Sequence, residues 1–156
     1  MKIWKHLRTE LIFLNKVLPD KNALLHFIAD TCQTQGVVKN RTSLFDGMKH
    51  REDTMSTGIG MGIGLPHTTN HEVDSLTILL IRLADPIDFD AIDGMPVDIV
   101  LSLVIPEHET MLHIQILAGI SRLCQNNSFI HAVKEAESSR KLLHTIQQLE
   151  EHMAFH

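Results

Sequence analysis

Glycine occupies every second position between Gly58 and Gly64, and this alternation constrains the chain more than any other feature. Mostly apolar residues stand between the glycines, so one face of the segment carries side chains and the other is bare. A repeat of two is typical of a strand and not of a helix. The run therefore predicts a strand leading into Pro66–His67, whose bare face lets another backbone or a partner protein approach closely.

Glycine-rich segments also bind nucleotides, but two features exclude that interpretation. A dinucleotide-binding fingerprint needs glycines that open a helix, whose N-terminus holds the pyrophosphate. Here the run leads into Pro66–His67, and no helical pattern follows at once. A phosphate-binding P-loop needs Gly-Lys-Ser or Gly-Lys-Thr, which is absent. A direct role of the run in holding a small anion is left open.

The remaining pattern predicts an α/β domain. Apolar runs at 11–14, 76–83 and 97–105 predict strands, the last two buried on both faces. Asp20 is a plausible N-cap for a helix that reaches about Gln35. Further helices are predicted at 42–52, 107–124, 128–136 and 139–151. Because strands and helices do not alternate strictly, we expect one domain over 1–156, with its core at about 11–150, built as a mixed β-sheet flanked by helices.

Composition excludes several classes of partner. The 156 residues carry a formal net charge of -5, without the basic stripe interleaved with aromatics that nucleic-acid binding requires. No apolar stretch approaches the roughly 18 residues of a membrane span, and the first ten residues do not resemble a signal peptide. We therefore expect a soluble, cytoplasmic protein. Cys32 and Cys124 lie in apolar, helix-like runs and are interpreted as reduced core thiols rather than a disulfide.

Eleven histidines raise the question of a metal site. His67 and His71 are four residues apart, but Pro66 makes a shared helical face there improbable. His108 and His113 are five apart, which on a helix is about 140° around the axis. We expect neither a metal nor a cofactor.

His67 is the residue best suited to chemistry. It follows a proline at the end of the predicted strand, where we expect its side chain to be exposed and rigidly aimed. Neutral imidazole is a competent nucleophile near pH 7, because its reference pKa is about 6.5. Arg51 could clamp phosphate oxygens, Ser56 and Thr57 could donate hydroxyl hydrogen bonds, and His113 could bring a helix N-terminus to the same place. From spacing alone, a merely structural or exposed histidine is the more frequent case.

Two stretches carry a resemblance to a known family. The first resembles the active-site signature of the fructose/mannitol-type IIA domains of the bacterial sugar phosphotransferase system, and it comprises Arg51–Glu52, Ser56–Gly60, Gly62–Ile63 and Pro66–His67. The second resembles the nitrogen-regulatory branch of that family, and it comprises 86–94, 96–98 and Pro106. Together the resemblance covers roughly Leu11 to Glu150.

The resemblance implies a role for each site residue. His67 would be phosphorylated by a histidine-phosphocarrier protein, itself supplied from phosphoenolpyruvate through an enzyme I. Arg51 would bind the phosphate, His113 would be the second active-site histidine, and Ser56 would be the serine of the Ser-Thr-Gly element. The implied fold is the IIA fold, a mixed sheet flanked by helices. This sequence departs from the family at Thr68, where glycine usually follows the histidine, and at Met61, where related proteins often carry a polar or acidic residue.

Three functions remain open at this point. In the first, phosphorylation decides which partner proteins the chain binds, because a phosphoryl group adds about -1.5 to -2 charge near neutral pH. In the second, the chain passes phosphate to a separate IIB domain of a sugar transporter. In the third, it is an unphosphorylated binding module. We favour regulation, because the chain has no IIB-like cysteine loop and no membrane segment, and because Phe89–Pro96 resembles the regulatory branch. A homodimer is left open.

Overall fold

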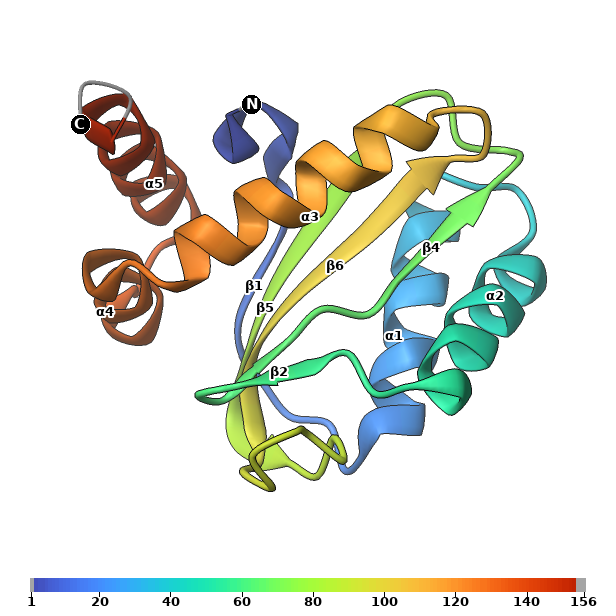
Figure 1. Ribbon diagram of the computed structural model, residues 1–156, viewed down its shortest axis with the longest axis horizontal. Coiled ribbons are helices and arrows are strands. Elements are labelled where there is room, and N and C mark those ends of the chain that lie inside the picture. Colours follow the sequence, from blue (N-terminus) through green and yellow to red (C-terminus); the bar gives the residue numbers. More distant parts are fainter. Residues whose placement is uncertain (1, 154–156) are drawn as a thin grey trace.

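A six-stranded mixed sheet lies between two layers of helices (Figure 1) in the computed structural model, which describes residues 2–153 apart from the side chain of Thr110. The strands are β1 (Leu7–Lys16), β2 (Gly58–Gly60), β3 (Ile63–Gly64), β4 (His67–Asn70), β5 (Thr77–Ile87) and β6 (Val97–Pro106). The helices are the 3₁₀-helix η1 (Ile3–His6), α1 (Lys21–Thr34), α2 (Arg41–Thr54), α3 (Thr110–Cys124), α4 (Asn127–Glu135) and α5 (Ser139–Met153).

The strand order is β1-β5-β6-β3-β2, and β4 also pairs with β6. β5 and β6 are antiparallel and form the long centre of the sheet, while β1 runs parallel to β5. β3 and β4 run parallel to β6, one after the other along the same edge. The predicted mixed sheet flanked by helices is confirmed.

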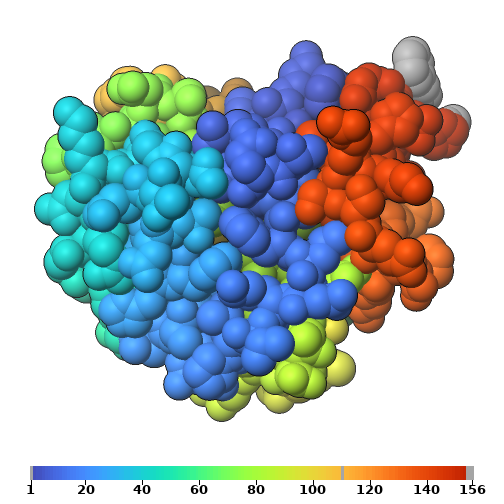
Figure 2. Space-filling view, turned by 180° about the vertical axis from the view of Figure 1, so that it is seen from behind, coloured from blue at the N-terminus to red at the C-terminus, as the bar shows by residue number. Residues whose placement is uncertain are grey.

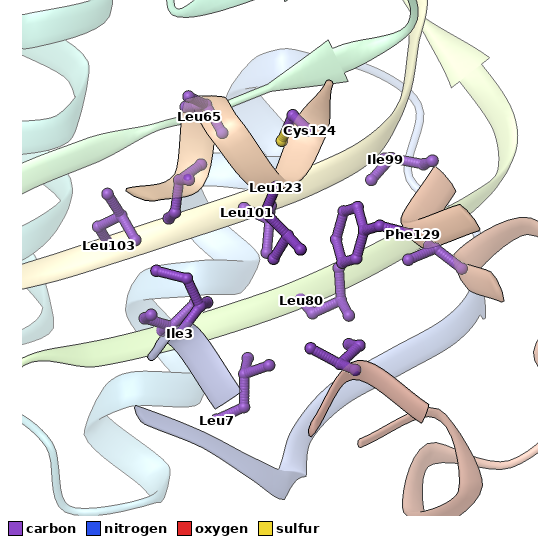
Figure 3. Close-up of a cluster of buried hydrophobic side chains, with 14 of the residues drawn as sticks. Ile3, Leu7, Leu65, Leu80, Ile99, Leu101, Leu103, Leu123, Cys124 and Phe129 are labelled. Carbon is purple, nitrogen blue, oxygen red and sulfur yellow. The ribbon is translucent and has the colours of Figure 1, made fainter. Parts of the chain in front are cut away.

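Alternating side chains divide the interior into two cores. On β5, Ile78 and Leu80 belong to the core under α3, α4 and α5, part of which Figure 3 shows. Leu79 and Ile81 belong to the other core, under α1 and α2, which cover much of the face seen in Figure 2. Burial of one such side chain contributes about 1.5–3 kcal/mol. The central strands are therefore apolar on both faces, which explains their continuous apolar runs.

Side-chain caps fix where the first two long helices begin. Asp20 accepts a hydrogen bond from the backbone N–H of Ala23 at 2.8 Å, as its predicted role as N-cap requires. Asn40 caps α2 by accepting from the backbone N–H groups of Thr42 and Ser43. Arg51 and Glu52 consequently lie in the last turn of α2, beside the loop that leads to β2.

The prediction of one long glycine strand was wrong. The segment is a tight hairpin in which β2 pairs antiparallel with β3. Met61 and Gly62 form the turn with φ values of 58° and 81°, and Gly60 at the end of β2 also has a positive φ, of 97°; these angles reverse the chain. The side-chain alternation of two short antiparallel strands resembles that of one long strand, so the pattern could not separate the two.

β4 was not predicted as a strand. Its sequence His-Thr-Thr-Asn has no apolar alternation, and its strand conformation comes from pairing with Leu103–Pro106 of β6. Within residues 2–153, no helix combines the length and apolar character that crossing a membrane would need.

Candidate active site around His67

His67 begins β4 and points to the face of the sheet that α3 covers. It pairs with Leu103 of β6, and the preceding Pro66 carbonyl accepts a hydrogen bond from the Leu103 N–H at 3.0 Å. Leu65, two residues earlier, belongs to the core under α3, and the period of two places His67 on the same side. The residue is only 6% exposed, so the expectation of an exposed side chain was wrong. His67 is buried because it lies on a sheet face that α3 covers, and not at a free strand end.

A backbone contact fixes the tautomer of the His67 ring. Nδ1 lies 2.7 Å from the carbonyl oxygen of Leu65. A carbonyl oxygen only accepts hydrogen bonds, so Nδ1 carries the proton in the neutral ring. Nε2 therefore keeps its lone pair, and the held ring gives that nitrogen a fixed direction.

His113 is a second imidazole that the structure places against this ring. The two ring centroids are 5.5 Å apart at an interplanar angle of 77°, an edge-on arrangement. His113 is half-buried and lies in the first turns of α3, and the Glu109 side chain makes no capping hydrogen bond at the start of that helix. The helix thus brings both an imidazole and the positive end of its dipole to the side of His67.

The surroundings lower the pKa of His67 below its ordinary value. Burial is the largest cause, because it penalises the charged ring; the positive charge of Arg51 and the electrostatic interaction with His113 act in the same direction. The hydrogen bond to Leu65 and the negative charge of Glu52 raise the pKa, but they do not outweigh burial. The ring is accordingly neutral at pH 7, the state that a nucleophile needs.

Arg51 supplies positive charge from the end of α2. Its Nη1 donates to the Met55 carbonyl at 2.9 Å, which holds the half-buried side chain against its own loop. Among the described residues this is the guanidinium's one protein hydrogen bond, so its other N–H groups are available to an anion. A planar guanidinium binds phosphate oxygens through paired hydrogen bonds.

The two hydroxyls of the Ser-Thr pair are already engaged in the structure. The Ser56 hydroxyl donates to the Phe89 carbonyl at 2.5 Å and accepts from the Gly58 N–H at 3.0 Å. The Thr57 hydroxyl donates to the buried carboxylate of Glu52. Direct binding of phosphate by either hydroxyl stays a prediction, and these contacts show that both also hold the loop between α2 and β2.

Thr68, which stands in place of the family's usual glycine, packs against α2. A Cβ atom added to Gly47 of α2 would lie 2.8 Å from the Thr68 Oγ1 atom. The absence of a side chain at Gly47 therefore makes room for Thr68. Within the part of the chain that the structure describes, no group of three or more His, Cys, Asp or Glu side chains is placed to hold a metal ion.

Comparison with known families agrees with the resemblance seen in the sequence. The family described as "Phosphoenolpyruvate-dependent sugar phosphotransferase system, EIIA 2" matches residues 5–149. The chain belongs to this family. Proteins of this kind relay phosphoryl groups within the phosphotransferase system, and the chain is such a component.

Individual relatives carry two different descriptions. A "PTS system fructose-specific EIIA component" of Haloferax volcanii is 31% identical over 142 residues, 91% of this chain and 92% of the relative. A "Nitrogen regulatory protein" of Bradyrhizobium diazoefficiens is 30% identical over 127 residues, 81% and 82% of the two chains.

Solved structures confirm the fold. The nitrogen regulatory protein IIA-Ntr of Neisseria meningitidis superposes with a TM-score of 0.85 at 25% identity, covering 92% of this chain and 98% of that one. The mannitol IIA of Escherichia coli superposes with a TM-score of 0.76 at 20% identity, covering 90% and 98%, and it shows the fold alone.

Sequence reasoning missed one member of the site. Glu52 was noted only as part of the Arg51–Glu52 signature, yet its buried carboxylate binds Thr57 and Lys21 and its charge acts on His67. An acidic residue in the last turn of α2 was the signal that could have found it, because a negative charge is unfavourable at a helix C-terminus.

Proposed function

We propose that this chain is a phosphohistidine carrier in which Nε2 of His67 accepts a phosphoryl group from the phosphohistidine of a carrier protein. The hydrogen bond from Nδ1 to the Leu65 carbonyl carries the proposal, because it leaves the Nε2 lone pair free. The lowered pKa of His67 adds to this, since the ring stays neutral at physiological pH. Attack by Nε2 needs no general base, because that nitrogen has no proton to lose.

The transfer exchanges one P–N bond for another. As the bond between phosphorus and Nε2 of His67 forms, the P–N bond on the donor histidine breaks, and its electron pair returns to the donor ring. The phosphoryl oxygens carry most of the charge in the transition state, so stabilisation comes from positioned cations and dipoles. Arg51, His113 and the uncapped start of α3 would supply them, and Ser56 and Thr57 are further candidates for the phosphate.

Exposed apolar side chains near the site suit a protein donor better than a small molecule. Met55 lies four residues beyond Arg51 and is 69% exposed, while Met111 and Ile114 on either side of His113 are 67% and 62% exposed. Large exposed apolar side chains around a functional group are typical of protein docking surfaces. The donor would be a histidine-phosphocarrier protein, with both proteins in the cytoplasm.

Regulation through phosphorylation-dependent partner binding is the role we favour. The superposition on a nitrogen regulatory protein and the resemblance of Phe89–Pro96 to that branch support it. The similarity to a fructose-specific EIIA component supports the second candidate, transfer onward to a separate IIB domain of a sugar transporter. A homodimer stays a prediction of the sequence.

The test is the intact mass of the protein after incubation with phosphoenolpyruvate, enzyme I and a histidine-phosphocarrier protein. We expect one acid-labile phosphoryl group on the wild type and none on His67→Ala. Arg51→Ala should slow uptake by roughly 10- to 150-fold, in line with the 1.5–3 kcal/mol of a charge-assisted hydrogen bond. No gain of mass with a competent donor would refute the carrier function and favour a module that acts by binding alone.

A second step separates the two roles. A IIB domain is added to the phosphorylated protein, and loss of the phosphoryl group to IIB is followed over time. Rapid transfer would support the transporter role, whereas a phosphohistidine that persists beside IIB would support regulation.

A further inference from the structure

Glu52 is a buried carboxylate near the C-terminus of a helix, a position that is unfavourable for negative charge. The residue is 5% exposed and lies in the last turn of α2, where the helix dipole opposes negative charge. Burial of an ionised carboxylate costs free energy unless hydrogen bonds and an opposite charge compensate it. A carboxylate at this position therefore needs compensating contacts, and the contacts of Glu52 indicate its role.

Three hydrogen bonds converge on this carboxylate. The Thr57 hydroxyl donates to Oε1, the Thr57 backbone N–H donates to Oε2 at 3.2 Å, and the Lys21 ammonium donates to Oε2 at 3.0 Å. The first two bind both the backbone and the side chain of Thr57, in the loop between α2 and β2, to the end of α2. The third comes from α1, so that the loop is fastened to the helical layer behind it.

The fastened loop reaches His67 through two backbone contacts. The Thr57 carbonyl accepts a hydrogen bond from the Leu65 N–H at 3.0 Å, and the Leu65 carbonyl accepts from His67 Nδ1 at 2.7 Å. Glu52 is thus connected through Thr57 and Leu65 to the nitrogen that sets the tautomer of the nucleophile. Arg51, the residue next to Glu52, is held to the same loop by its bond to the Met55 carbonyl.

A second set of contacts supports the loop from its other side. The Lys21 ammonium lies 4.5 Å from the centroid of the Phe89 ring, and the Phe89 carbonyl accepts from the Ser56 hydroxyl. The Phe89 ring also packs on Gly64, where an added Cβ atom would lie 3.0 Å from it. Gly64, the residue before Leu65, is therefore held in place by Phe89, which itself contacts Lys21 and Ser56.

We propose that Glu52 is a positioning residue for phosphoryl acceptance, which acts through Thr57 and Leu65 to hold the His67 ring with Nδ1 protonated and the lone pair of Nε2 free. The proposal rests on the carrier function proposed above and adds to it a part for Glu52, Thr57 and Lys21. The Thr57 hydroxyl then serves the site by holding Glu52.

Four variants of this chain test the proposal. Thr57→Val removes the hydroxyl at nearly constant shape, and Thr57→Ser keeps it. Glu52→Gln removes the charge and one acceptor oxygen. Asp53→Asn is the matched control, because it removes a charge from the adjacent position on α2, where Asp53 pairs with Lys49 at the surface.

Two readouts apply to the folded protein. The ¹⁵N shifts of the His67 ring report its tautomer, and a single turnover with saturating phosphorylated carrier protein reports the rate of transfer. In Thr57→Val and Glu52→Gln we expect a mixture of tautomers and a rate roughly 10- to 100-fold lower, the range that small misplacement of a reacting group produces. Asp53→Asn should keep the wild-type tautomer and rate, and Thr57→Ser, which retains the hydroxyl, should keep the single tautomer that Thr57→Val loses.

A merely structural role gives a different result. If Thr57→Val and Glu52→Gln lower the melting temperature while the tautomer and the rate of the folded fraction stay at wild-type values, the proposal is overturned. Should Glu52→Gln not fold, the nearly isosteric Thr57→Val decides. A wild type that accepts no phosphate would refute the carrier function, and the tautomer comparison would still decide whether Glu52 positions His67.

Discussion

The site depends on one imidazole whose two nitrogens have separate tasks. Nδ1 of His67 is held by the Leu65 carbonyl, and Nε2 is left for phosphorus. Burial lowers the pKa of this ring, and the nearby charges of Arg51 and His113 lower it further. A cationic Arg51 beside the phosphate and a neutral nucleophile are therefore consistent with each other, because the positive charge that attracts the phosphoryl oxygens also disfavours protonation of the His67 ring.

The lowered pKa predicts how phosphoryl uptake depends on pH. An unperturbed histidine is half protonated near pH 6.5. Because His67 has a lower pKa, the decline of the uptake rate on acidification should have its midpoint below pH 6.5. An NMR titration of the unphosphorylated protein checks this, with a midpoint for His67 expected below 6.5; a midpoint at or above that value would contradict the electrostatics described here.

The same shift has a consequence for stability. His67 binds a proton less readily in the folded than in the unfolded chain, so below pH 6.5 the unfolded state binds more protons. The free energy of unfolding should accordingly fall as the pH decreases through that value. His6, whose pKa burial also lowers, acts in the same direction.

At the scale of elements, the contact between β4 and α2 explains how the chain accommodates Thr68. Gly47 lies opposite the Thr68 hydroxyl, with space for a hydrogen atom but not for a methyl group. A glycine inside a helix costs about 0.5–1 kcal/mol relative to alanine, so its presence in the middle of α2 calls for a packing reason. Thr68 is that reason.

We predict that Gly47→Ala destabilises the protein in spite of its higher helix propensity. Overpacking a filled contact costs about 1–3 kcal/mol, which outweighs the gain in propensity. In a Thr68→Gly background the clash is absent, and Gly47→Ala should become neutral or stabilising. Urea unfolding of the two single variants and the double variant measures this coupling, and additive effects would exclude the contact as its cause.

The elements also show what a sequence pattern can and cannot reveal. Apolar runs and helix caps predicted β5, β6 and the helices, because those elements follow from local periodicity and from residues such as Asp20. β4 was missed because its strand conformation depends on β6, and the hairpin at Met61 was missed because backbone φ angles leave no mark in side-chain alternation. The residues around the site were found through their motif, whereas the burial of His67 and the contacts of Glu52 depend on tertiary packing that no local pattern contains.

At the scale of the whole molecule, one question is whether its two helical layers unfold together. The sheet is shared, but the core under α1 and α2 and the core under α3 to α5 are separate groups of side chains. Each contains one free cysteine: Cys32 lies in the first core, and Cys124, which Figure 3 shows, lies in the second. The two thiols therefore report on the two layers independently.

Both thiols should resist alkylation in the native protein. Burial raises the pKa of Cys32 and of Cys124 to about 12, so only about one in ten thousand is a thiolate at pH 8, and neither is accessible to a reagent. Because the central strands β5 and β6 contribute side chains to both cores, opening of one layer exposes part of the interface that holds the other. We therefore expect the two cysteines to be modified at one common slow rate, which rises in parallel with urea as the whole chain unfolds. Mass spectrometry of peptides after timed exposure to iodoacetamide measures both rates, and faster labelling of Cys124 than of Cys32 would show that the layer carrying His113 opens by itself.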